Sequence, residues 1–361
     1  MAPLRSAPGS ARRRVAVLGA TGAVGQTFVR LLANHPWFEL VAVAASDRSA
    51  GRPYAEATRW LGDDPIPPDI AGLNVEPCEP DRIDADIVFS ALDSSVAGGA
   101  ELAFAAAGRA VLTNAKNHRM APDVPLVIAE VNADHLAVIA AQRRGRGWSG
   151  CIVANGNCAT IVAAMALAPL HQRFRVTQVF AATMQAVSGA GYPGVPSLDI
   201  LGNVIPYISD EEGKIEGEIP KFLGTVDGGV IRPAAVAVTA HANRVPVADG
   251  HTVCLSIAFA HPVTPDRVME ALEDWRGASD ARDLPSAPER PLLLARDPAR
   301  PQPRRDALAG QGMSVVAGRV RVDPVFDVKL VAVGHNVIRG AAGASVLNAE
   351  LLMSRGLLAP A

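Results

Sequence analysis

The sequence of 361 residues has few cysteines, few aromatic residues and no long apolar stretch. Its four cysteines show no CxxC spacing, which argues against a disulfide scaffold or a zinc ribbon and favours a reducing, cytoplasmic compartment. No apolar run has membrane-spanning length. Lysine plus arginine number 34 and aspartate plus glutamate 36, so the net charge of −2 gives no bulk attraction to nucleic acid or anionic membranes.

What is present is typical of a globular enzyme, with 49% hydrophobic and 19% charged residues. The length suggests two domains. The first residues, Met1–Arg14, are basic and rich in small side chains but lack the apolar core of a signal peptide. We expect a disordered tail here, with a transit peptide as the alternative.

The first half reads as alternating strands and helices. An apolar strand over residues 14–18 meets a glycine turn, and the helix that follows ends before Pro36. A second strand covers residues 39–45, and short connections of this kind require parallel pairing. Further expected elements are strands at 86–90, 110–113 and 126–129 and a helix at 101–108. The pattern predicts an α/β fold with a Rossmann-type, doubly wound parallel sheet over residues 15–155.

The second half, residues 156–340, has longer strands, expected at 176–184, 235–239 and 252–259. A hairpin turn is expected at Asp249-Gly250, which suits an α+β domain with a mixed or antiparallel sheet. The segment 279–305, rich in proline and arginine, reads as a surface excursion. Residues 343–358 read as a helix with one apolar face, and we expect 341–358 to complete the first domain.

Three glycines, Gly19, Gly22 and Gly25, stand between the first strand and the first helix. Their GxxGxxG spacing allows a tight turn and close approach of a pyrophosphate, which the N–H groups of the helix start would bind. After the second strand comes Ser46-Asp47-Arg48-Ser49. An arginine between serines suits the 2′-phosphate of NADP, whereas Asp47 leaves NAD open.

Cys158, in the segment Asn155-Gly-Asn-Cys158-Ala-Thr, stands where an apolar helix is expected to begin. A helix N-terminus stabilises a thiolate and lowers the pKa of the thiol, so Cys158 is the candidate nucleophile. Cys78, Cys151 and Cys254 have apolar or undistinguished surroundings and read as inert cysteines.

A reactive thiol needs a proton donor or acceptor, and among the eight histidines His251 is the best candidate because it follows a turn and an arginine, Arg244. His118 and His241 stay possible. A two-residue turn at 249–250 would put Arg244 and His251 on one face but about 13 Å apart, unless a wider turn or a kink at Pro246 brings them closer. The charged run 211–221 fits either a solvated helix face or a functional one placed opposite Cys158.

Together these segments resemble aspartate-semialdehyde dehydrogenase over nearly the whole chain, and the flanking sequences at 46–54 and 114–120 resemble its archaeal and fungal branch. The family often has another residue at Gly156 and at Ala129, which affects loop stiffness only. The motifs that carry the resemblance are Gly19-Ala-Thr-Gly-Ala-Val-Gly-Gln, Asn157-Cys-Ala-Thr, Gln185-Ala-Val-Ser-Gly-Ala-Gly-Tyr-Pro-Gly, Glu211-Glu-Gly-Lys214, Arg244-Val-Pro-Val-Ala-Asp-Gly-His251 and Val337-Ile-Arg-Gly-Ala-Ala-Gly.

The resemblance implies that Cys158 is the nucleophile, His251 the general acid/base and Gln185 the residue that orients the intermediate. Arg244 would bind the substrate carboxylate and Glu211 its amino group. Implied contacts to phosphate or elsewhere in the cleft are Lys214, Arg119, Asn114 and Asn157. Cofactor contacts, from the glycine turn, the serine–arginine segment and the resemblance, are Gly19, Thr21, Gly22, Ala23, Val24, Ser46, Arg48, Ser49, Ser188, Gly189 and Asn336. No metal is implied.

The implied reaction is NADP-dependent reductive dephosphorylation of L-aspartyl-4-phosphate to L-aspartate 4-semialdehyde through a cysteine thioester. It would serve lysine, threonine, methionine and isoleucine biosynthesis, with inorganic phosphate as partner and a homodimer or homotetramer as assembly. Three alternatives stay open: a reductase of malonyl-CoA or another acyl-CoA, an N-acyl-glutamyl-phosphate reductase, and a non-catalytic NADP-binding regulator.

Overall fold

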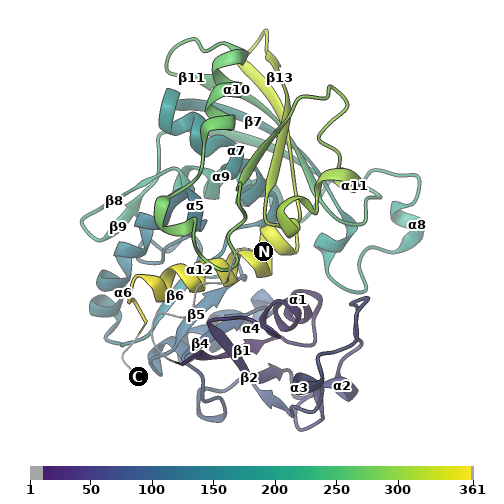
Figure 1. The fold of residues 1–361 in the computed structure, drawn as a ribbon, viewed down its shortest axis with the longest axis vertical. Coiled ribbons are helices and arrows are strands. Elements are labelled where there is room, and N and C mark those ends of the chain that lie inside the picture. The colour runs from purple at the N-terminus through teal and green to yellow at the C-terminus, as the bar shows by residue number, and fades with distance from the viewer. Residues whose placement is uncertain (1–10, 359–361) are drawn as a thin grey trace.

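The computed structural model describes residues 11–358, and they form two six-stranded sheets with helices packed on and between them (Figure 1). The first sheet is entirely parallel, in the order β3-β2-β1-β4-β5-β6. Its strands are β1 (Arg13–Leu18), β2 (Phe38–Ala45), β3 (Val75–Pro77), β4 (Ile87–Ser90), β5 (Ala110–Thr113) and β6 (Cys151–Ala154). Reversal of the strand order at β1 makes the sheet doubly wound, as the sequence predicted.

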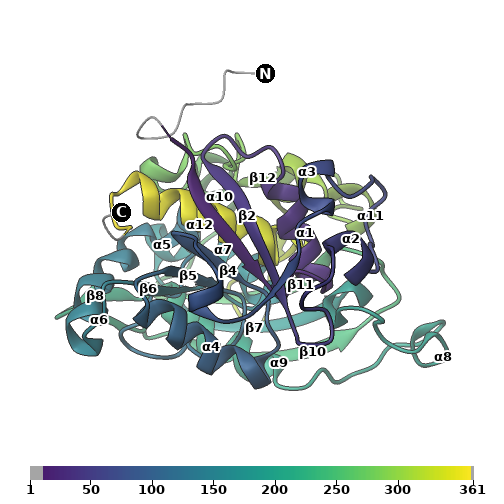
Figure 2. The same ribbon diagram turned by 90° about the horizontal axis from the view of Figure 1, so that it is seen from below.

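Helices cover this sheet, so its central strands are buried on both faces and read as continuous apolar runs (Figure 2). The helices of this half are α1 (Ala23–Leu32), α2 (Tyr54–Ala57), α3 (Pro68–Ala71), α4 (Ser94–Ala106), α5 (Ala129–Asn132) and α6 (Ile139–Arg146). The strand expected at 126–129 is wrong: only Leu126 makes a bridge, to Ala154, and α5 begins at Ala129. Burial of Leu126–Ala129 explains the misleading apolar run, and the sheet position belongs to β6 instead.

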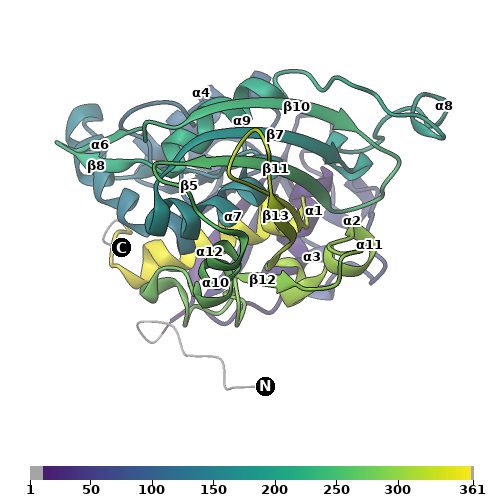
Figure 3. The same ribbon diagram turned by 90° about the horizontal axis from the view of Figure 1, so that it is seen from above.

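The second sheet is mixed, in the order β10-β7-β11-β14-β13-β12. Figure 3 shows β10, β7 and β11 on the side facing the viewer. Its strands are β7 (Val176–Gln185), β10 (Ala237–Arg244), β11 (His251–Phe259), β12 (Leu292–Ala295), β13 (Val315–Val322) and β14 (Val328–Gly334). A small antiparallel pair is formed by β8 (Thr225–Asp227) and β9 (Val230–Arg232). The helices of this half are α7 (Cys158–Phe174), α8 (Ser197–Ile200), α9 (Glu211–Phe222), α10 (Pro265–Asp274) and α11 (Pro303–Asp306).

The hairpin expected at Asp249-Gly250 is wrong. The strands before and after it, β10 and β11, do not pair with each other, because β7 lies between them. β10 runs parallel to β7 and β11 runs antiparallel to it. Residues 245–250 are therefore a connection that passes over the end of β7, and the two strand ends that it joins meet beside Gln185.

Two expectations for the C-terminal part need correction. The segment 279–305 is more than a surface excursion, because it supplies the edge strand β12, and Ser286 hydrogen-bonds the buried Glu350. The last helix, α12 (Gly343–Ser354), is buried all round through Met353 rather than on one face. It packs against α1, α5 and β5, in the region between the two sheets (Figure 1).

The predicted tail, Met1–Arg14, lies mostly outside the described residues, and its last two residues belong to β1. Among residues 11–358, no helix combines the length and the apolar character needed to cross a bilayer. The segment that carries α8 extends away from the body in the three ribbon views (Figures 1, 2 and 3).

Candidate active site

Cys158 is the first residue of α7, as the sequence predicted. Asn157 caps the helix: its side-chain oxygen accepts hydrogen bonds from the backbone N–H groups of Ala159 and Thr160, at 3.0 and 3.1 Å. The helix cannot rotate within the fold, because its residues from Ala159 to Leu170 are buried. The thiol is therefore fixed at the edge of the first sheet, just after β6.

The structure reverses the expected direction of the cysteine pKa. Burial, followed by the nearby charge of Glu211, raises the pKa of Cys158 to about 12, against the opposing effects of Arg119, the Ala159 N–H group and Arg244. Without a bound ligand Cys158 is therefore a thiol. Burial also raises the pKa of Cys78, Cys151 and Cys254.

His251, the first residue of β11, contacts the thiol directly. Its Nε2 lies 3.0 Å from the Cys158 Sγ, and its Nδ1 accepts a hydrogen bond from the backbone N–H of Ala186 at 3.1 Å. Burial, followed by the charge of Arg244, lowers the pKa of His251 to about 3. The ring is therefore neutral, and because Nδ1 is an acceptor its proton sits on Nε2, facing the sulfur.

Arg244 and His251 are brought together by β7 rather than by a hairpin. Arg244 pairs in register with Gln185, and its Nη1 donates to the backbone carbonyl of Ala186 at 2.7 Å. The same residue, Ala186, thus holds both the imidazole and the guanidinium. Gly189 lies against both: a Cβ there would come 2.8 Å from the Arg244 Nη1 and 3.0 Å from the His251 ring. The separation of about 13 Å between Arg244 and His251, expected from residue spacing along a hairpin, does not apply because β10 and β11 do not form a hairpin.

Glu211 is buried at the start of α9, so the functional alternative for the charged run is the one the structure supports. Its carboxylate accepts hydrogen bonds from Asn157, Gln185 and Lys214, at 2.8 to 3.0 Å. Burial by itself would raise the pKa of Glu211, but Lys214 and then the hydrogen bonds from Asn157 and Gln185 lower it overall. Through Asn157, the Glu211 carboxylate is therefore linked to the cap of the helix that begins at Cys158.

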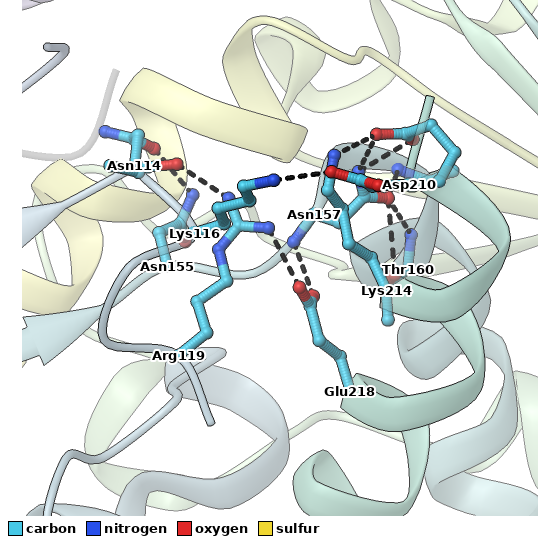
Figure 4. Close-up of polar contacts among 12 residues, drawn as sticks. Asn114, Lys116, Arg119, Asn155, Asn157, Thr160, Asp210, Lys214 and Glu218 are labelled. Carbon is cyan, nitrogen blue, oxygen red and sulfur yellow. Dashed lines mark hydrogen bonds and ion pairs between the residues drawn. The ribbon is translucent and has the colours of Figure 1, made fainter. Parts of the chain in front are cut away.

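The predicted phosphate contact Arg119 is also buried, and sequence reasoning missed its partner Glu218 (Figure 4). Arg119 donates to Glu218 at 2.8 Å and to the backbone carbonyl of Asn114 at 2.6 Å. Asn155, also missed, donates to the side chain of Asn114 at 2.9 Å. Both could have been noticed: Glu218 follows Glu211 by two helical turns, and Asn155 lies beside the cysteine motif.

The structure gathers some of the predicted cofactor residues around one cavity of about 570 Å³, whose lining includes Ala23 and Ser188. Asn336 joins this wall, donating to Ser188 at 2.8 Å and accepting from the Gly250 N–H at 2.8 Å. Gly19 has a φ of +72°, and a Cβ there would come 2.5 Å from the Ala91 carbonyl, so only glycine fits this turn.

The segment that was expected to bind the 2′-phosphate stands apart from that cavity lining. Ser46 and Arg48 are exposed after β2, and Ser49 is half-buried. Thr21, Gly22 and Val24 form the turn and the first turn of α1, where Gly22 occupies the N-cap without a side chain. Nowhere in residues 11–358 do three His, Cys, Asp or Glu side chains gather in a way that could hold a metal ion.

Fold and site define a class: an α/β protein in which a doubly wound parallel sheet and a mixed sheet meet at a half-buried cysteine paired with a buried histidine. Family models agree, since residues 14–139 match the semialdehyde dehydrogenase NAD binding domain and residues 167–339 the semialdehyde dehydrogenase dimerisation domain.

The particular relatives are aspartate-semialdehyde dehydrogenases. The chain is 47% identical to the one from Archaeoglobus fulgidus, covering 96% of this chain and all of the relative. It is 44% identical to the one from Schizosaccharomyces pombe, covering 96% and 99%. The solved structure of the Candida albicans enzyme with NADP superposes with a TM-score of 0.89 at 40% identity, covering 96% and 100%. The chain belongs to the aspartate-semialdehyde dehydrogenase family, and both its archaeal and its fungal members are among the relatives.

Proposed function

We propose that this protein catalyses the NADP-dependent reductive dephosphorylation of L-aspartyl-4-phosphate to L-aspartate 4-semialdehyde through a thioester on Cys158. The observation that carries the proposal is the Sγ–Nε2 contact of 3.0 Å, with Arg244 and Glu211 buried in the same network. The names of the relatives and the NADP in the Candida albicans structure support it.

The residues around the cofactor cleft fit NADP. The N-terminus of α1, opened by Gly22, offers free N–H groups for a pyrophosphate. Exposed Ser46 and Arg48, with Ser49, would hold the 2′-phosphate. Ser188, Gly189 and Asn336 lie on the path toward Cys158 and would contact the nicotinamide end. The bound cofactor would supply a hydride to the acyl group.

Acyl transfer comes first. The Cys158 thiol loses its proton as its sulfur attacks the carbonyl carbon of the acyl phosphate: a C–S bond forms, the C–O bond to phosphate breaks, and the proton leaves on the phosphate. Phosphate leaves toward Arg119 and Lys214. Because burial and Glu211 keep Cys158 protonated in the empty site, ligand charges must favour the thiolate: the substrate ammonium neutralises Glu211, which removes one of the causes of the raised pKa.

His251 then assists the departure of the sulfur as a hydrogen-bond donor. After reduction of the thioester the tetrahedral intermediate expels the sulfur, and the Nε2–H of His251 faces that sulfur at 3.0 Å. Its hydrogen bond from Ala186 fixes the ring in the tautomer that donates. In the reverse direction the same hydrogen bond stabilises the attacking thiolate. Gln185, buried between Glu211 and Arg244, would orient the intermediate.

Substrate recognition would use two opposite charges. Arg244 offers a planar fork to the α-carboxylate, and Glu211 offers an anion to the α-ammonium. Malonyl-CoA has no ammonium to pair with the Glu211 carboxylate, which would then keep only its partners within the protein, Lys214, Asn157 and Gln185. The charge pattern of the site therefore favours the aspartyl group over an acyl-CoA.

The wider setting follows from the same proposal. The product would feed lysine, threonine, methionine and isoleucine biosynthesis in the cytoplasm. A homodimer or homotetramer would form through the second domain, in line with the dimerisation-domain match. We assign residues 15–155 and the helix within 341–358 to the NADP-binding domain and 156–340 to the catalytic domain, supported by the packing of α12 on β5 and α1.

One assay tests the proposal against its competitors. Purified protein should reduce NADP⁺ when given aspartate semialdehyde and phosphate, with no reaction when phosphate is omitted. The same preparation is offered malonyl-CoA and an N-acyl-glutamate semialdehyde with matched cofactor. Faster reduction of malonyl-CoA would assign the protein as an acyl-CoA reductase, and NADPH binding without turnover of any substrate would make it a regulator.

A further inference from the structure

Glu218 joins the predicted phosphate residue to the loop that carries the nucleophile. It lies on α9, is 2% exposed, and its carboxylate has two partners (Figure 4). One oxygen accepts from the Arg119 guanidinium at 2.8 Å, and the other accepts from the backbone N–H of Asn157 at 2.6 Å. Both hydrogen bonds involve an ionised group, which makes them stronger than neutral ones.

The contact with Asn157 fixes the position of the thiol. Asn157 caps α7 and immediately precedes Cys158. Its backbone is held by Glu218 and its side chain by Glu211, so two carboxylates from one face of α9 hold the start of the helix. Gly156 allows this close approach, because a Cβ there would come 2.5 Å from Phe222 and 3.2 Å from the Glu218 carboxylate.

The contact with Arg119 sets the charge of the pocket. The guanidinium is 7% exposed and uses Nη1 for Glu218 and Nη2 for the carbonyl of Asn114. Its Nε is buried without a hydrogen-bond partner among the described residues, so the guanidinium has donor capacity that these residues do not use. Glu218 therefore orients the guanidinium and also offsets its positive charge.

We infer that Glu218 is a positioning residue with two tasks: it holds Cys158 in place through Asn157, and it weakens the attraction of Arg119 for phosphate so that phosphate can leave. The inference rests on the proposed function, because Arg119 is a phosphate residue only there. The two tasks depend on different properties of the side chain: the first needs its reach, and the second needs its charge.

Two substitutions separate these properties. Glu218→Gln keeps the length and one acceptor oxygen, which can still accept from the Asn157 N–H, but it removes the charge and the acceptor that faces Arg119. Glu218→Asp keeps the charge but is one methylene shorter, so it cannot reach both partners. The matched control is Glu216→Gln on the same helix, where the carboxylate also accepts from a backbone N–H, that of Ala240 at 3.0 Å, away from Arg119.

The first measurement is calorimetric titration with inorganic phosphate, which needs no turnover. We expect Glu218→Gln to bind phosphate roughly tenfold more tightly than the unmodified protein, the size that one charge contributes in a partly buried site. Glu216→Gln should keep the original Kd. An unchanged or higher Kd in Glu218→Gln would overturn the charge role.

The second measurement is the rate of Cys158 alkylation by iodoacetamide against pH, together with kcat. We expect Glu218→Asp to keep the phosphate Kd within about twofold but to change the alkylation profile and lower kcat about tenfold, the loss typical of one charge-assisted hydrogen bond. If Glu218→Asp leaves the alkylation profile and kcat unchanged, Glu218 does not hold Cys158 in place through Asn157. Equal effects of Glu218→Gln and Glu218→Asp on both the phosphate Kd and the alkylation profile would also overturn the inference, because they would indicate a general loss of structure.

A failed proposed function would look different. If the unmodified protein turns over neither aspartate semialdehyde nor an acyl phosphate, the proposed function fails, whereas the phosphate Kd values and the alkylation profiles still test Glu218. Unfolding temperatures of the three variants show that each one is folded before these comparisons are made.

Discussion

The nucleotide side of the cleft and the surroundings of Cys158 are built in opposite ways. Ser46, Arg48 and Gly22 are exposed, and they belong to short contiguous segments at strand ends. Around Cys158, by contrast, His251, Gln185, Glu211 and Asn157 are buried, and hydrogen bonds link His251 to Cys158 and Glu211 to Gln185 and Asn157. Substitutions on the nucleotide side should therefore act singly, whereas those around the thiol should affect several neighbours at once and combine non-additively.

The largest effect should come from Cys158→Ala. We expect turnover to fall by about a thousandfold or more, since no other group can carry the acyl intermediate. NADPH affinity should stay unchanged, because the nucleotide motifs are separate from the thiol. The measurements are steady-state kinetics and fluorescence titration with NADPH. Cys254→Ala, on β11, is the control and should affect stability at most; near-normal turnover in Cys158→Ala would end the thioester proposal.

His251 should come next. We expect His251→Ala to lower kcat by roughly 10²–10³, the range for removal of one hydrogen-bond donor that stabilises developing negative charge. His251→Gln should retain more activity than His251→Ala, because an amide N–H can still donate toward the sulfur. If the two variants lose the same activity, the donor role of Nε2–H is wrong.

His251 also makes a prediction for stability. Its pKa falls from 6.5 to about 3 on folding. Below pH 6.5 the imidazole of His251 therefore binds a proton in the unfolded chain but not in the folded protein. The stability that His251 contributes is therefore complete above pH 6.5 and is lost as the pH falls toward 3. Urea unfolding between pH 7 and 4.5 should show a shallower pH dependence in His251→Gln. His241→Gln, at an exposed position on β10, should leave the slope as it was.

Glu211→Gln tests whether the buried network carries substrate charge. We expect the KM for aspartate semialdehyde to rise by about 10- to 100-fold, the size of a lost charge-assisted hydrogen bond. Because Glu211 raises the pKa of Cys158, alkylation of Cys158 should persist and extend to lower pH. An unchanged KM would show that Glu211 does not bind the substrate and only holds Asn157 and Gln185 in place.

Arg48→Ala should have the most confined effect, because it should change one property alone, the affinity for NADP. A guanidinium paired with a 2′-phosphate contributes about 1.5–3 kcal/mol, so affinity for NADP should fall roughly 10- to 100-fold while that for NAD changes little. Stability should not change, because Arg48 is exposed. Equal losses for both cofactors, measured by titration, would show that Arg48 does not contact the 2′-phosphate.

The same contrast explains which expectations the sequence could support. The glycine turn and the helix start at Cys158 are local: backbone geometry and an asparagine cap define them within a few residues. The strand at 126–129 failed because an apolar run reports burial, which a buried loop shares with a strand. The hairpin at 249–250 failed because the turn residues Asp-Gly do not reveal that another strand lies between β10 and β11.

For the charged residues, too, some properties follow from local sequence and others only from tertiary packing. The Glu211–Lys214 spacing indicates a shared helix face from sequence alone, but the burial of that face depends on α9 packing against the loop before Cys158. The lowered thiol pKa was expected from the helix start, which is local, whereas burial and Glu211, which are not local, reverse its direction. Glu218 follows Glu211 by two helical turns in the same charged run, but its partners Arg119 and Asn157 lie far from it in the sequence.

The sequence by itself thus determined the parallel first sheet, the glycine turn and the helix that begins at Cys158, because each depends on neighbouring residues and on side-chain periodicity. Only the tertiary structure decided that His251 and Arg244 both hydrogen-bond to the backbone of Ala186, and that Glu218 joins Arg119 to Asn157. These contacts join residues far apart in the chain, and their geometry comes from strand order and helix packing, which no local pattern encodes.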